Sequence, residues 1–91
     1  MNDKEIRQLI ADNKILAAEC RASREYQAAR IDENDARLEA FDEETSEPLD
    51  GATPEQFESV NRAAEISISK ESDRSKAMEK TDKSGALERA K

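Results

Sequence analysis

The residues best suited to chemistry in this sequence are carboxylates, which cluster between Asp32 and Asp50. Nine acidic residues and one basic residue give this segment a net charge of −8, whereas the other 72 residues have a net charge of +1. Catalysis by carboxylates alone requires a dry cleft that shifts their pKa values. A calcium loop requires a regular ligand spacing and a central glycine, which this segment lacks. We therefore expect an acidic tip made by Asp32, Glu33, Asp35, Glu39, Asp42, Glu43, Glu44, Glu47 and Asp50, with no metal bound.

Other residue types that support catalysis are scarce. The chain has no histidine, one cysteine and two glycines. Without histidine there is no Ser/His or Cys/His pair, and two isolated glycines cannot form a glycine-rich phosphate-binding loop. The lone Cys20 cannot form an intramolecular disulfide and is expected to be a small apolar residue on a helix face. We therefore predict a protein that is not an enzyme and that has no cofactor and no small-molecule substrate.

A long helix is predicted to position most of these residues. Asn2 is a suitable N-cap, with Glu5 three residues later, and no glycine or proline interrupts residues 3 to 47. Apolar residues recur at steps of three and four, which places them on one narrow helix face. The pattern predicts a helix over about residues 3–44. Its helix-packing or partner seam is expected to contain Ile6, Leu9, Ile10, Leu16, Cys20, Ile31, Leu38 and Phe41.

Two asparagines interrupt this apolar face and allow two interpretations. Asn13 and Asn34 are either buried asparagines that fix the register and partner number of a coiled coil, or solvated residues on a helix that packs only locally. The sequence leaves both interpretations open.

A second helix is predicted after a loop over about residues 45–53, which contains Pro48 and Gly51. Thr53 is a suitable N-cap, Pro54 occupies the first helical position, and Gln56 follows three residues after the cap. The helix is expected over about residues 54–81. Its contribution to the seam is expected to be Phe57, Val60, Ala64 and Ile68.

The predicted fold is therefore an all-α antiparallel helical hairpin over residues 1–81, followed by a mobile C-terminal tail over residues 82–91. Leu, Ile, Val and Phe make up only 14 of the 91 residues. Because so few large apolar side chains rarely stabilise a monomer, we expect a coiled-coil or four-helix-bundle homodimer. No apolar stretch has the length of a signal peptide core or a membrane span, so we expect a cytoplasmic protein that binds no membrane.

These features predict a small non-catalytic interaction protein that inhibits or adapts a partner protein through the seam. A second hypothesis is an acidic nucleic-acid mimic that inhibits a DNA- or RNA-binding enzyme by occupying a basic surface with its tip. In size and charge the chain resembles small acidic anti-restriction and anti-CRISPR proteins of phages. A third hypothesis is a structural assembly or scaffolding element. Direct nucleic-acid binding is not expected, because the most basic region, residues 70–91, has a net charge of only +2.

Overall fold

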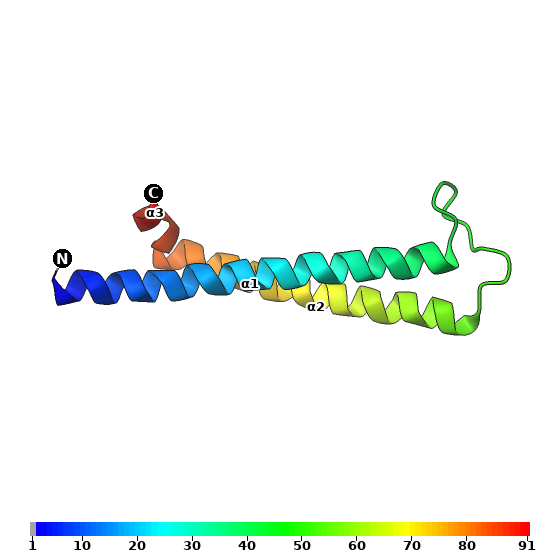
Figure 1. Cartoon of the computed structure of the whole chain (residues 1–91), viewed down its shortest axis with the longest axis horizontal. Helices are drawn as coiled ribbons and strands as arrows, with labels where there is room; N and C mark the ends of the chain where they lie inside the picture. The colour runs from blue at the N-terminus through cyan, green and yellow to red at the C-terminus, as the bar shows by residue number, and fades with distance from the viewer. Residues whose placement is uncertain (1) are drawn as a thin grey trace.

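The computed structural model describes residues 2–91 and confirms the all-α helical hairpin. Helix α1 (Asp3–Ala40) and helix α2 (Pro54–Ser84) pack side by side in opposite directions, and a short helix α3 (Ala86–Ala90) follows. Together they form a rod of 66 × 22 × 17 Å (Figure 1). The N-terminal end of α1 projects beyond the other helices, and every residue from Asn2 to Ala11 is exposed (Figure 1).

Helix α1 begins as predicted but ends earlier. The side chain of Asn2 accepts a hydrogen bond from the Glu5 backbone N–H at 2.9 Å. The helix ends at Ala40, before the predicted boundary near residue 44, because Phe41 is extended, with φ −130° and ψ 150°. The Asp42 carboxylate then accepts hydrogen bonds from the backbone N–H groups of Glu44 (2.9 Å) and Thr45 (3.0 Å). Such local side-chain bonds compete with helix continuation.

The loop between the helices, residues 41–53, is closed by its own hydrogen bonds. Phe41 and Pro48 form an isolated antiparallel bridge, and the Leu49 N–H donates to the Ala40 carbonyl at 2.9 Å. The ring of Phe41 meets the ring of Phe57 edge to face, with centroids 5.4 Å apart. The loop is therefore fastened to the ends of both helices.

Helix α2 begins with the predicted capping box. The Gln56 N–H donates to the Thr53 hydroxyl at 3.3 Å, and the Thr53 N–H donates to the Gln56 side-chain oxygen at 2.8 Å. The helix continues to Ser84, three residues past the expected end, and stops where Gly85 takes a left-handed conformation with φ 74°. Glycine is the residue best suited to this helix ending.

Small and polar side chains form the interface between α1 and α2. Most of the buried and half-buried residues of α1 recur at alternating steps of three and four, as do most of those of α2. This is the repeat of helices packed along their length. In α1 the series is Asp12, Ile15, Glu19, Ala22, Tyr26, Ala29, Glu33, Ala36 and Ala40. In α2 it is Val60, Ala63, Ser67, Lys70, Arg74, Ala77, Thr81 and Ser84. We call these two series the inner face.

The C-terminal residues fold back onto α1. Residues 82–84 complete α2, and Ala86, the first residue of α3, is fully buried. Arg89 of α3 pairs with Asp12 of α1, 77 residues earlier in the chain. The sequence assigned these residues to a tail and did not predict this contact.

Candidate interaction surface

Most of the predicted seam residues lie on the outside of the hairpin. Six large ones are exposed by 42% (Ile6) to 67% (Ile68), namely Ile6, Leu9, Ile10, Ile31, Leu38 and Ile68. Cys20 is also exposed. Leu16, Phe41, Phe57 and Ala64 are half-buried, and Val60 is buried. Apart from residues near the loop, the predicted seam therefore does not join α1 to α2, and its role as a partner seam stays a prediction.

The outward residues of α1 form a second regular series, which we call the outer face. It consists of Ile6, Ile10, Asn13, Ala17, Cys20, Arg24, Gln27, Ile31, Asn34 and Leu38, again at alternating steps of three and four. This series is offset from the inner face by two residues, which is about 200° around an α-helix. Helix α1 therefore has two packing stripes on opposite sides, and only one of them is covered in the hairpin.

The two asparagines belong to the outer face. Asn13 and Asn34 are both exposed in the hairpin, so neither fixes the packing of α1 on α2. A role in setting register can therefore belong only to an interface with another molecule.

The acidic tip divides into one buried carboxylate and eight exposed ones. Glu33 lies on the inner face with 5% of its surface exposed, and it pairs with Arg30 at 3.2 Å and with Arg37 at 3.6 Å. The exposed acids are Asp32, Asp35, Glu39, Asp42, Glu43, Glu44, Glu47 and Asp50. The hydrogen bonds from the Thr45 and Glu44 N–H groups lower the pKa of Asp42 below its ordinary value. Glu33 is thus buried and paired within α1, and the other acids are exposed.

An open depression connects the outer face to the loop. Its volume is about 490 Å³, and it is lined by Asn34, Arg37, Leu38, Phe41, Asp42, Glu43, Ser46 and Val60. Apolar side chains are mixed with an arginine and two acids in this lining. This arrangement suits an inserted side chain of another protein more than an enclosed reaction.

The hairpin is also fastened by long-range polar contacts that the sequence did not reveal. Asp12 is 5% exposed, and its two oxygens accept from Nε and Nη2 of Arg89, each at 2.7 Å. The side chain of Gln8 donates to the same carboxylate at 2.8 Å. Hydrogen bonding by Arg89 lowers the pKa of Asp12 although burial opposes this shift, and the same pairing raises the pKa of Arg89. Nothing in the sequence pattern pairs Asp12 with Arg89, because the inner-face position of Asp12 is known only from the structure.

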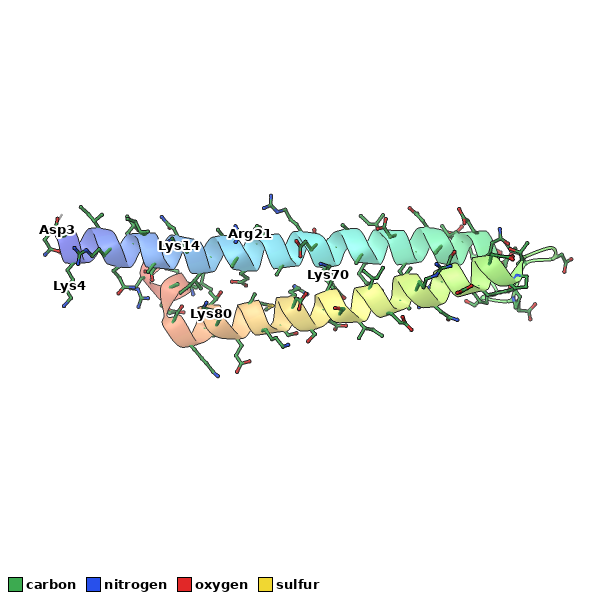
Figure 2. All side chains as sticks on the ribbon, turned by 90° about the horizontal axis from the view of Figure 1, so that it is seen from below. Asp3, Lys4, Lys14, Arg21, Lys70 and Lys80 are labelled. Atoms are coloured by element: carbon green, nitrogen blue, oxygen red, sulfur yellow. The ribbon has the colours of Figure 1, made fainter. Side chains whose placement is uncertain are left out.

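Two further contacts lie near the middle of the rod. The guanidinium of Arg74 stands over the Tyr26 ring, 5.3 Å from its centroid, and Lys70 pairs with Glu25 at 3.3 Å. The basic side chains Lys14, Arg21 and Lys80 lie in the half of the rod away from the loop (Figure 2). The molecule therefore has an acidic end and a mildly basic end.

Among residues 2–91, no group of three or more histidine, cysteine, aspartate or glutamate residues is placed to hold a metal ion. No helix in the same residues combines the length and the apolar character needed to cross a membrane. Comparison of the chain with models of protein families, with curated proteins and with solved structures found no match. The outer face and the acidic loop are thus the two surfaces from which a function can be argued.

Proposed function

We propose that this protein is a non-catalytic helical interaction protein that binds a partner protein through the outer face of α1, and so inhibits or adapts that partner. One observation supports this proposal above all. The hairpin closes mainly on small and polar residues such as Ala29, Ala40 and Ser67. Most of its large aliphatic residues are exposed, the exceptions being Ile15, Leu16 and Val60. A helix that needed only its hairpin partner would bury those aliphatic residues instead.

The exposed aliphatic residues of the outer face would lower the free energy of a complex if a partner buried them. Complete burial of a large aliphatic side chain contributes about 1.5–3 kcal/mol. Ile10 and Ile31 retain 50% and 62% of their exposure, so about half of that contribution is still available at each position. Exposed aliphatic residues that share one helix face are typical of a helix that packs on a further partner.

The acidic loop supports a second candidate function, binding to a basic surface. Eight of the nine acids of the tip are exposed, and the loop is fastened by the Phe41–Pro48 bridge and by the Asp42 turn. Ordered carboxylates of this kind suit an acidic mimic of a nucleic-acid backbone. Such binding depends strongly on salt, because charges separated by more than about 10 Å are screened at 0.1 M ionic strength.

Affinity capture from a lysate of the native source tests both candidates with three baits. The first is the wild-type chain. The second is an outer-face variant, Ile31→Lys with Leu38→Lys. The third is a tip variant, Glu43→Lys with Glu44→Lys and Glu47→Lys. Each bait is washed at low and at high salt, and circular dichroism confirms that each variant is helical.

We expect a partner that the wild type and the tip variant retain at both salt concentrations and that the outer-face variant loses. A partner that the wild type and the outer-face variant retain at low salt and lose at high salt, and that the tip variant loses at both, would favour the acidic mimic instead. If all three baits captured the same proteins, neither surface would be the binding site, and both candidates would be wrong.

A further inference from the structure

The residues of the outer face indicate which molecule covers it. We infer that this molecule is a second copy of the chain, with the two α1 helices parallel and in register. This inference rests on the proposed function because it names the partner of the same surface. Two α1 helices would then pack in the centre, with each α2 on the outside.

The order of residues along the outer face favours pairing of like with like. In a parallel, in-register pair, each of the ten positions meets its own counterpart. Six of the resulting layers are apolar: Ile6, Ile10, Ala17, Cys20, Ile31 and Leu38. Three layers, Asn13, Gln27 and Asn34, pair an amide with an amide, which can donate to and accept from its counterpart. Polar residues in a coiled-coil core specify register at a cost in stability, an effect described for a positions, whereas Asn13 and Asn34 would stand at d positions.

The antiparallel alternative matches these residues poorly. Full overlap of the two stripes would place Ile10 against Asn34 and Ile31 against Asn13. Each amide would then face an aliphatic side chain and lose its hydrogen-bond partners, which is destabilising for a buried polar group. Only the layer between Ile6 and Leu38 would be apolar on both sides.

The residues that flank the stripe are compatible with the parallel arrangement. In parallel coiled coils a flanking residue meets the residue five positions later in the other chain. Arg30, whose side chain is 58% exposed while it pairs with Glu33, would then stand opposite Asp35 of the second copy. The remaining flanking pairs contain no like charges. Two features are unfavourable in this arrangement. One is the layer of Arg24 against Arg24, whose long side chains can extend to solvent, and the other is the placement of the two acidic tips, each with a net charge of −8, at the same end of the pair.

Oxidative crosslinking tests both the partner and its orientation. A disulfide requires Cα atoms within about 7 Å, and the parallel pair places Cys20 directly opposite its counterpart. We expect mild oxidation of the wild type to give a covalent dimer that a reductant reverses. The variant Cys20→Ala with Asn34→Cys should also crosslink. In an antiparallel pair the residue-34 thiols would lie 24 residues apart along the axis, or about 36 Å.

A matched pair of substitutions tests the surface. Ile31 and Ile68 are exposed to similar extents, 62% and 67%, but only Ile31 lies on the outer face. We expect Ile31→Lys to weaken self-association by tenfold or more in sedimentation equilibrium, and Ile68→Lys to change it by less than twofold. Crosslinking of the unmodified chain does not depend on either variant folding correctly.

Three outcomes would overturn the inference. They are a wild type that is monomeric up to about 100 µM, a dimer whose residue-34 thiols do not crosslink, and a dimer weakened equally by both lysine substitutions. The wild type could be monomeric and capture a protein that the Ile31→Lys, Leu38→Lys variant does not capture. That result would overturn self-association but support the proposed function. A monomer that captures no protein through this face would overturn both.

Discussion

At the scale of single residues, Asp12 shows how one carboxylate joins two distant parts of the chain. It accepts two hydrogen bonds from Arg89 and one from Gln8, at a position where solvent hardly reaches. Charge-assisted bidentate pairs of this geometry are stronger than neutral hydrogen bonds. The contact therefore orders α3 against α1 only while Asp12 is ionised.

The stability of the hairpin should consequently depend on pH in the acidic range. The pKa of Asp12 is lower in the folded state than its ordinary value of 3.8. The stabilisation from Asp12 is thus complete above about pH 4 and is lost as the pH falls through the folded-state pKa. In urea unfolding followed by circular dichroism, Asp12→Asn should lower stability at pH 7 and lose less of its remaining stability between pH 7 and pH 3 than the wild type does.

The control for this experiment is Asp73→Asn, which alters an exposed aspartate of α2. It should leave both the stability at pH 7 and the loss on acidification close to those of the wild type. Equal behaviour of the two variants would show that the pair with Arg89 does not stabilise the fold.

At the scale of helices, the inner face is composed mainly of small and polar residues, whereas hydrophobic periodicity selects large apolar ones. Ala22, Ala29 and Ala36 stand seven residues apart on α1 and leave little volume between the helices. Small side chains let backbones approach closely, so the interface is thin and closely packed. A larger side chain at such a position has no space to occupy without moving the helices apart.

Ala29→Leu should therefore destabilise the hairpin, although leucine forms helix well and is more hydrophobic. Ala29 is 6% exposed, and overpacking of a buried position costs about 1–3 kcal/mol. The adjacent Ala28→Leu is the matched control, because Ala28 is exposed and leucine there should change the free energy of unfolding by less than about 0.5 kcal/mol. A stabilised Ala29→Leu variant in urea unfolding would contradict the close packing.

The helices themselves were predictable from sequence, whereas their contacts were not. Asn2, Thr53 and Pro54 act through neighbouring backbone groups, and such local chemistry predicted both helix starts. The earlier end of α1 depends on the Asp42 turn, which competes with the helix by a small energy difference. The inner face escaped prediction because alanine, serine and buried acids have little hydrophobic signal. The contact of Arg89 with Asp12 depends on the fold as a whole.

For the candidate site, the sequence identified the apolar residues of the outer face but not which helix they would face. Ile31 and Leu38 follow the same steps of three and four as Ala29 and Ala36. Periodicity therefore shows that a helix has a packing stripe but not which neighbour covers it. The comparison of exposed and buried residues in the hairpin separates the two stripes.

At the scale of the whole molecule, the charges are divided between the two ends of the rod. The segment from Asp32 to Asp50 has a net charge of −8 at one end, and the far end, which contains Lys14 and Lys80, is mildly basic (Figure 2). Because the acidic end contains the loop and the adjoining part of α1, its repulsion acts within the folded molecule. Charge repulsion of this kind opposes the compact state.

Added salt should therefore raise the melting temperature. The screening length falls from about 30 Å at 0.01 M to about 10 Å at 0.1 M ionic strength, which weakens repulsion between the exposed acids. Neutralising the tip with Glu43→Gln and Glu44→Gln should raise the melting temperature at low salt and reduce the effect of added salt. The same measurement on Glu71→Gln with Asp73→Asn, which removes two exposed acids outside the tip, should show no such rise. A melting temperature that falls with salt would mean that attractive pairs dominate.

The projecting N-terminal end of α1 determines where the molecule opens first. The residues from Asn2 to Ala11 are all exposed, so their conformation is maintained mainly by the helical hydrogen bonds, the Asn2 cap and the bond from Gln8 to Asp12. A short stretch of uncovered helix is marginal in water, and its amide hydrogens exchange through local fraying long before the centre of the rod unfolds. Helix order is therefore graded along the rod. We expect it to be weakest at the projecting end, where Ile6 and Ile10 are exposed, and strongest where Ala29 is buried between the two long helices.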